Sequence, residues 1–237
     1  MGKVLILQNA ALFSAGTFES ELQSREISYS YHKVYEEDVP IEDILPAVSG
    51  LIVLGGPLTY RVTQPESSTG LKKLLSFLSK ALEMKIPCIG VAQGACLLAR
   101  AKGAWVEPAP EKQLGWINAE VYPDYSRNSV IYSKVEEKKF PVFTWCDTLH
   151  GFPPEGYWYL NSPKCRYLST GINGNSYLFN FHPEITEEMV GQWLQHYFQD
   201  LGSKELAAQL KEATREHIEQ AQAFSHKIIH AFESFLR

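Results

Sequence analysis

The chain has 237 residues, 45% of them hydrophobic, which fits one large α/β domain or two small ones and excludes a mostly disordered protein. Its net charge of −5 and scattered basic residues argue against nucleic acid or an anionic membrane as a partner. The apolar run at residues 4–7 is too short for a signal peptide or a membrane span. Four cysteines without metal-finger spacing predict free thiols in the cytoplasm and no metal or cofactor.

The first half of the chain alternates short apolar runs with helical patterns. Residues 3–8, 51–54 and 88–91 read as buried strands, because continuous apolar runs are typical of a parallel sheet covered on both faces. Residues 71–84 and about 94–101 repeat apolar positions at helical spacing. This order predicts an α/β fold with a doubly wound, mostly parallel sheet flanked by helices.

The pattern changes between residues 116 and 181. Short β-rich pieces alternate with turns and predict an antiparallel or mixed extension of the same domain, at residues 117–122, 130–132, 142–145, 157–160 and 176–181. Thr186 is placed to cap a following helix, with Glu187 and Glu188 at its positive end. Gly202 is expected to stop that helix, so the main domain is predicted to span residues 1–202.

Residues 203–237 form a C-terminal helical extension in this prediction. Apolar or small residues recur at three- and four-residue steps from Leu206 to Phe235. An unbroken helix of this length would be about 50 Å long, more than the diameter of such a domain. We therefore expect a bent or broken helix packed on its own core, with a dimer contact as the alternative.

A strand-to-helix turn at residues 90–96, Gly-Val-Ala-Gln-Gly-Ala-Cys, is the first candidate for chemistry. A sharp turn here would expose Ala92 at the carboxyl end of the strand, in the geometry of a nucleophile elbow. The amides at the start of the next helix would be placed to stabilise an oxyanion. Alanine itself supplies no nucleophile, and the segment alone also fits ordinary α/β packing.

Two further motifs follow predicted strands. In His182-Pro183-Glu184 the one-residue gap lets the carboxylate orient the imidazole, as in a catalytic triad, although a structural histidine is the plainer interpretation. In Gly55-Gly56-Pro57 the glycines allow close approach of a ligand, and their amides are able to donate to an anion, although such glycines are usually a tight turn.

Taken together, these motifs resemble class I glutamine amidotransferases, the family that contains the glutaminase domain of GMP synthetase. The resemblance runs from Lys3 to about residue 198 and is nearest to stand-alone members. The matching segments are 54–57 (the oxyanion strand), 87–104 (the elbow and its helix), 114–116 (Leu-Gly-Trp) and 181–184 (Phe-His-Pro-Glu). It implies a class I glutamine amidotransferase-like fold with a flavodoxin-like core.

The resemblance also implies roles. In the family a cysteine at the position of Ala92 attacks the side-chain amide of glutamine, the histidine at 182 transfers the proton, and the glutamate at 184 orients it. The amides of Gly56 and Gln93, with Gly55 beside them, would form the oxyanion and substrate site. The released ammonia normally passes to a synthetase domain or subunit, for which this chain has no room.

Three positions depart from the family pattern. Ala92 replaces the nucleophile, and Cys96 stands where members usually have glutamine near the substrate. Residues 145–148, Trp-Cys-Asp-Thr, occupy the place of a Trp-His-Gly-Asp motif, so Cys146 replaces a histidine. Among the other thiols, only Cys146 is a plausible substitute nucleophile, since Cys96 lies a helical turn beyond the elbow.

Three interpretations of function remain open. The first and preferred one is a pseudo-enzyme that binds a small ligand, such as glutamine or a related amino acid or amide, or acts as a regulator. The second is an active glutamine amidotransferase or amide hydrolase in which Ala92 was engineered from cysteine. The third is an enzyme that uses another nucleophile or an activated water. Expected partners are a second copy of the chain or a separate synthetase.

Overall fold

The computed structural model describes residues 2–36, 38, 40, 42–56, 69–126, 129–197 and 203–236. Pro57, in the predicted Gly55-Gly56-Pro57 turn, and Gly202, the predicted end of a helix, lie outside the described residues. The described helices and strands follow one another along the chain as β1 (Lys3–Gln8), α1 (Thr17–Ser24), β2 (Tyr29–Lys33), η1 (Glu42–Ala47), β3 (Val48–Val53), α3 (Thr69–Glu83), β4 (Cys88–Val91), α4 (Gln93–Ala101), β5 (Val106–Val121), α5 (Pro123–Ser126), η3 (Tyr132–Lys134), β6 (Lys139–His150), β7 (Tyr157–Ser162), β8 (Cys165–Ile172), β9 (Ser176–Phe179), α6 (Glu187–His196) and α8 (Lys204–Glu233).

Nine described strands form one mixed sheet in the order β2-β1-β3-β4-β9-β8-β7-β5-β6. The five strands from β2 to β9 are parallel, and each of the remaining pairs is antiparallel. Strand β9 joins the parallel and antiparallel parts of the sheet, because it pairs in parallel with β4 and antiparallel with β8. The predicted α/β fold and its antiparallel extension are confirmed.

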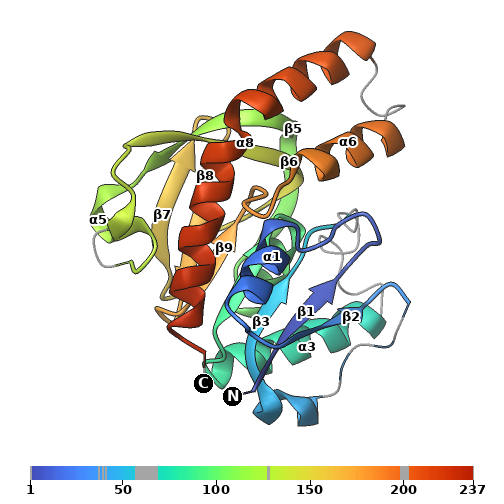
Figure 1. The fold of residues 1–237 in the computed structure, drawn as a ribbon. Coiled ribbons are helices and arrows are strands. Elements are labelled where there is room, and N and C mark those ends of the chain that lie inside the picture. The colour runs from blue at the N-terminus through green and yellow to red at the C-terminus, as the bar shows by residue number, and fades with distance from the viewer. Residues whose placement is uncertain are drawn as a thin grey trace.

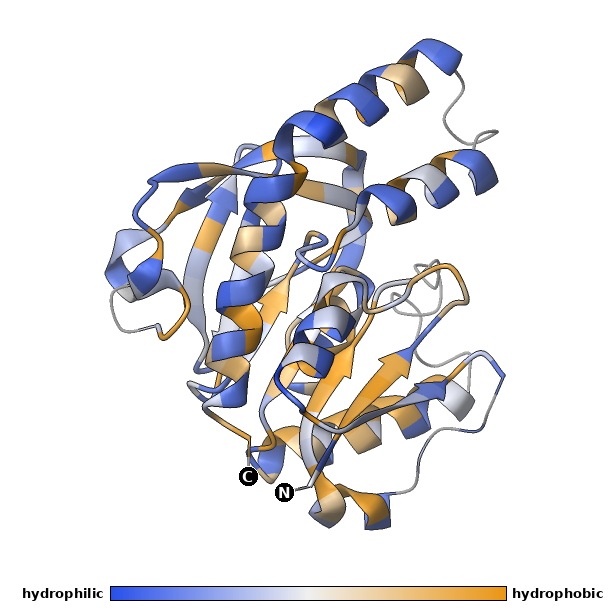
Figure 2. Ribbon diagram, viewed as in Figure 1, coloured by the Kyte–Doolittle hydropathy of each residue, from blue (hydrophilic) through white to orange (hydrophobic). Residues whose placement is uncertain are grey.

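Helices cover both faces of the parallel strands (Figure 1). On one face, alternate strand residues such as Ile6 and Ile89 pack against Phe18 of α1 and Ile228 of α8. On the other, Leu51 and its counterparts pack against the apolar sides of α3 and α4. Figure 2 shows the central parallel strands as largely hydrophobic, as expected for strands buried on both faces.

The C-terminal segment forms one continuous helix, α8, of 30 residues. The helix is bent and not broken, since its axis changes direction part-way along (Figure 1). Ser203 caps its start by accepting from the N–H of Leu206 at 3.0 Å. Its second half buries Phe224, Ile228 and Phe232 against the sheet, whereas its first half lies beside α6.

Several expectations need correction. Residues 130–132 are not a strand but a turn leading into the 3₁₀ helix η3, held by the Ser129 hydroxyl, which accepts from the N–H groups of Ile131 and Tyr132. Strand β9 ends at Phe179, two residues earlier than expected. Helix α1 and strands β2 and β8 were missed, because their residues are only partly apolar and lack clear periodicity.

Candidate functional site

The turn between β4 and α4 forms a strained elbow centred on Ala92. Ala92 has φ 48° and ψ −111°, a left-handed conformation that is costly for a residue with a Cβ. Its N–H donates to the carbonyl of Phe179 at 2.7 Å, which ties the elbow to β9. A Cβ on Gly94 would collide with the carbonyl oxygen of Val53, so only glycine allows α4 to start this close to β3.

His182 and Glu184 form a buried pair just beyond β9. The backbone N–H of His182 donates to the carbonyl of Phe143 at 2.8 Å, which fixes the histidine against β6. Its Nδ1 lies 2.8 Å from Oε1 of Glu184, and both side chains are buried. Because the carboxylate accepts from Nδ1, Nε2 carries the lone pair, and it has no hydrogen-bond partner among the described residues. The role that the sequence assigns to Glu184, orienting the imidazole of His182, stays a prediction.

Gly55 lies between Ala92 and His182. A Cβ built on Gly55 would lie 3.2 Å from Cε1 of His182 and 3.5 Å from Cβ of Ala92. The elbow and the imidazole therefore approach each other across the end of β3, where a larger residue would crowd both. Thus the parallel strands β3 and β4 and the segment after β9 each bring one motif to the same carboxyl edge of the sheet.

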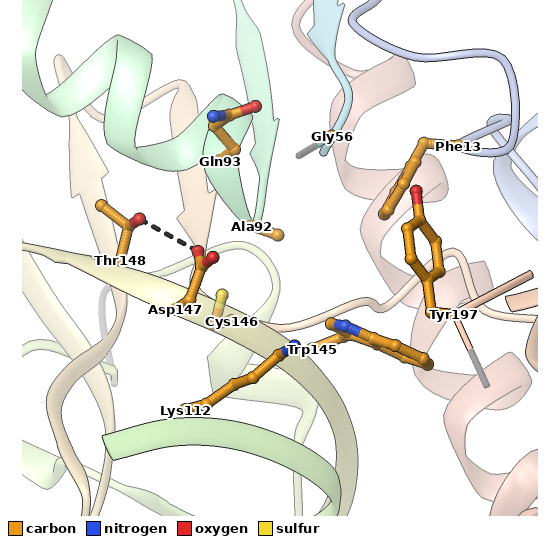
Figure 3. Close-up of a pocket in the computed structure, with 10 residues that line it drawn as sticks. All are labelled: Phe13, Gly56, Ala92, Gln93, Lys112, Trp145, Cys146, Asp147, Thr148 and Tyr197. Atoms are coloured by element: carbon orange, nitrogen blue, oxygen red, sulfur yellow. Dashed lines mark hydrogen bonds between the residues drawn. The ribbon is translucent and has the colours of Figure 1, made fainter. Parts of the chain in front are cut away.

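A pocket of about 140 Å³ opens in front of Ala92 (Figure 3). Its wall combines residues from the segments after β1 and β3, the elbow, β5, β6 and the end of α6, namely Phe13, Gly56, Ala92, Gln93, Lys112, Trp145, Cys146, Asp147, Thr148 and Tyr197. Lys112 and Asp147 give the mouth one positive and one negative charge. Thr148 donates from Oγ1 to Oδ1 of Asp147 at 3.1 Å, which holds the carboxylate along β6.

Aromatic rings hold the imidazole of His182 in place. Trp193 meets it edge to face with ring centroids 4.8 Å apart, and Phe13 stacks on Trp193 at 4.8 Å while its own ring lies 6.1 Å from the imidazole. The indole N–H of Trp193 donates to the carbonyl of Leu12 at 2.8 Å, so its position is fixed by the chain that carries Phe13. This packing excludes water from the histidine–glutamate pair and limits the imidazole to one orientation.

The two cysteines near the site are buried thiols. Cys96 lies beneath the elbow, with its Sγ 3.7 Å from Oδ1 of Asn180, and it is fully buried. Burial, reinforced by Cys165 and Asp147, raises the pKa of the Cys146 thiol well above its usual range. Since the thiolate is the nucleophile, neither geometry nor ionisation favours these thiols for attack.

The structure divides the predicted site residues into two groups. Gly56, Ala92, Gln93 and Cys146 line the pocket. Gly55, Cys96, His182 and Glu184 are buried behind it. The pocket residues that sequence reasoning missed are Phe13, Lys112 and Tyr197, which come from three distant segments and carry no local motif. Trp145, Asp147 and Thr148 flank Cys146, so the altered motif at residues 145–148 already indicated that they lie near the site.

The described part of the chain contains neither a metal-binding cluster nor a membrane-spanning helix. No group of three or more His, Cys, Asp or Glu side chains there is arranged to hold a metal ion. No helix among the described residues combines the length and apolar character needed to cross a membrane.

Comparison with curated proteins points to one group of relatives. No protein-family model matches the chain. GMP synthase (glutamine-hydrolyzing) of Lachnospira eligens is 27% identical over 151 residues, which are 63% of this chain and 26% of that protein. The glutamine amidotransferase-like protein YfeJ of Salmonella typhimurium is 25% identical over 189 residues, which are 79% of this chain and 78% of that protein.

The chain is glutamine amidotransferase-like. It spans only about a quarter to a third of the GMP synthases that it matches, but most of the length of YfeJ. Solved structures show the same fold. A glutamine amidotransferase from Methylobacillus flagellatus superimposes with a TM-score of 0.87 at 21% identity, covering 100% of this chain and 96% of that one. One from Thermotoga maritima gives 0.83 at 21% identity, covering 98% and 97%.

Proposed function

We propose that this glutamine amidotransferase-like chain is a pseudo-enzyme that binds a small amino acid or amide at the Ala92 pocket without hydrolysing glutamine. The supporting observation is the elbow itself, where the methyl group of Ala92 occupies the position that carries the nucleophilic cysteine in the resembling family. Removal of a triad nucleophile costs about 10⁶-fold in rate in a serine protease. The buried thiols of Cys96 and Cys146 offer no replacement.

The pocket keeps the groups that bind a ligand without reacting with it. The main-chain N–H groups of Gly56 and Gln93 face no hydrogen-bond acceptor within the described residues, and both residues line the pocket. Gln93 is the first residue of α4, so its amide belongs to the positive end of a helix dipole. These donors depend only on backbone shape, and they suit a carbonyl or carboxylate oxygen.

The charges at the mouth favour a zwitterion. Lys112 on β5 and Asp147 on β6 both line the pocket and are placed to pair with the α-carboxylate and the α-ammonium group of an amino acid. The aromatic rings of Phe13, Trp145 and Tyr197 would then cover its aliphatic part. Glutamine and related amino acids or amides are therefore the proposed ligands.

A second candidate function is an active amidotransferase or amide hydrolase in which Ala92 was introduced in place of cysteine. The observation that favours it is the intact His182–Glu184 pair, with an Nε2 lone pair that has no partner in the described structure. The replacements at Cys96 and Cys146 favour the pseudo-enzyme, because a change designed to trap substrate would alter the nucleophile alone.

The partners are also a proposal. The resembling GMP synthases are longer chains, and one similar structure, with a TM-score of 0.67 at 16% identity, is named for one subunit of a GMP synthase from Thermoplasma acidophilum. We therefore propose a separate synthetase-type protein, or a second copy of this chain, as the protein partner.

Calorimetry with the full chain tests the ligand. Glutamine, asparagine and glutamate should release or absorb heat at millimolar concentration, and none should yield ammonia. Lys112→Gln should weaken binding about tenfold, as expected for loss of one charge-assisted hydrogen bond. Lys211→Gln on the exposed side of α8 is the matched control and should leave binding unchanged. Absence of heat from all three ligands would contradict the proposal, as would rapid ammonia release.

A further inference from the structure

A second cavity lies where β5 begins and β6 ends, and it shares no lining residue with the Ala92 pocket. Its volume is about 350 Å³, which is within the range of small-ligand sites. The walls are largely aromatic and include Trp105, His150, Phe152, Arg166 and Tyr167. None of them belongs to the elbow, the histidine–glutamate pair or the first pocket.

Two of the aromatic walls are exposed to solvent. Trp105 is 53% exposed and Phe152 is 37% exposed, which is unusual for side chains of this size. Trp105 is nevertheless held in place, because its carbonyl accepts from the N–H of Gly151 at 2.9 Å and its indole lies directly on that glycine. Phe152 packs beside Tyr167 with ring centroids 5.5 Å apart. The rings thus form a fixed apolar surface that is open to a ligand.

His150 supplies an unused acceptor at the buried side of the cavity. Its Nδ1 lies 2.8 Å from the carbonyl oxygen of Gly151, and since a carbonyl only accepts, Nδ1 carries the hydrogen. Nε2 is therefore an acceptor, and it has no partner among the described residues although the side chain is only 1% exposed. A buried acceptor without a donor is unfavourable, and a ligand N–H or O–H would satisfy it.

Arg166 supplies a positive charge at the rim. Its guanidinium lies 5.4 Å from the ring centroid of Trp158 and 5.6 Å from that of Tyr167. No carboxylate among the described residues comes within 4.0 Å of it. The two rings, which meet edge to face, orient the guanidinium and leave its N–H groups available for an anion.

We propose that this cavity binds a small aromatic anion. The flat ring of the ligand would pack on Trp105 and Phe152, a ring N–H or O–H would donate to Nε2 of His150, and a carboxylate or phosphate would pair with Arg166. Nucleoside monophosphates and aryl carboxylates share this chemistry. The site is independent of the ligand proposed for the Ala92 pocket.

Ligand-observed NMR and calorimetry with the full chain test this site. The probes are guanosine 5′-monophosphate and indole-3-acetate at millimolar concentration, with guanosine as the neutral analogue and inorganic phosphate as the anion alone. Binding of either aromatic anion supports the proposal. The tighter-binding probe shows whether the ligand class is a nucleoside monophosphate or an aryl carboxylate. Failure of both to bind would overturn it.

Two substitutions locate the binding. Arg166→Gln should weaken the anion about tenfold and leave guanosine unchanged, whereas Trp105→Ala should weaken the anion and guanosine by about the same factor. Arg215→Gln and Tyr35→Ala are matched controls, an exposed arginine on α8 and an exposed ring just after β2 at the opposite edge of the sheet. Binding that neither Arg166→Gln nor Trp105→Ala alters would also overturn the proposal.

Discussion

At the scale of single residues, Ala92 keeps the geometry of a reactive position without its reactive atom. Its positive φ costs of order 1 kcal/mol, and the surrounding fold imposes it through the hydrogen bond to Phe179 and the tight contact at Gly94. Strain of this kind usually accompanies a functional site. The same strain would hold a cysteine at position 92 in the attack position.

Ala92→Cys separates the two candidate functions. The new thiol would lie at the start of α4 and close to His182, so its thiolate should form readily and alkylate fast. If the site has drifted naturally, ammonia release from glutamine should stay at least about 10³-fold below normal enzyme rates, because positioning groups at 96 and 146 are missing.

The paired measurement is the rate of thiol alkylation by iodoacetamide and the rate of ammonia release from glutamine. Ala92→Ser is the matched control, with similar size and no reactive thiol. Glutamine turnover by Ala92→Cys at about 1–10³ per second would contradict the pseudo-enzyme proposal and favour the engineered alternative.

The natural thiols should behave differently. All four cysteines are buried and free, and burial raises the pKa of Cys88 to about 12 and that of Cys165 to about 12. At pH 8 a thiol with such a pKa is about 0.01% thiolate, so we expect almost no alkylation of the folded chain. Mass spectrometry after iodoacetamide treatment checks this, with the urea-unfolded chain as the control. Rapid labelling of Cys146 would contradict this prediction and support Cys146 as a substitute nucleophile.

At the scale of elements, α8 covers the face of the sheet on which Phe179 and Phe181 lie. Phe224 packs against Tyr132, Phe140, Phe179 and Phe181, with ring centroids 5.0–6.4 Å apart. Thr17 and Ser225 hydroxyls meet at 2.6 Å and join α8 to α1. The C-terminal extension thus completes the hydrophobic core on that side of the sheet.

Phe224→Ala should lower the free energy of unfolding by about 3–5 kcal/mol, because it removes a buried ring and leaves a cavity. Urea denaturation followed by circular dichroism measures the change. Gln220→Ala, an exposed position one turn earlier on the same helix, should change stability by less than about 0.5 kcal/mol. Equal effects of the two substitutions would show that this part of α8 does not contribute to the core.

At the scale of the whole molecule, the antiparallel strands carry a titratable group that couples folding to pH. His150 pairs with Val106 across β5 and β6 and is buried there. Burial lowers the pKa of its imidazole from 6.5 to about 4, and the hydrogen bond to Gly151 only partly offsets this. Between pH 6.5 and pH 4, His150 is therefore mostly protonated in the unfolded chain and mostly neutral in the folded chain.

The resulting stability is present above pH 6.5 and is lost as pH falls toward 4. Between pH 7 and pH 4.5 this single group should cost about 2–3 kcal/mol of unfolding free energy. In His150→Gln that part of the pH dependence should disappear, although the variant is less stable at neutral pH. Urea denaturation at several pH values measures both slopes, and parallel slopes would refute the assignment.

Much of this molecule is determined by local sequence. The apolar runs at Lys3–Gln8 and Cys88–Val91 and the helical repeat of Leu71, Leu74 and Leu78 predict the parallel sheet and one of its helices, because each pattern has a single way to bury its apolar side. The motifs around Ala92 and at His182-Pro183-Glu184 are contiguous, so their residues could be recognised without any tertiary contact.

Tertiary structure alone decided how these motifs come together. Strand β8 and helix α1 were missed because their burial depends on partners far along the chain. Residues 130–132 have the composition of a strand, but the Ser129 hydroxyl accepts hydrogen bonds from the N–H groups of Ile131 and Tyr132 and holds the segment in a turn. Lys112 and Tyr197 carry no local pattern and reach the Ala92 pocket through the curl of β5 and the end of α6. A pocket forms between segments distant in sequence. The packing interactions that position its walls join these segments, so no single segment reveals them.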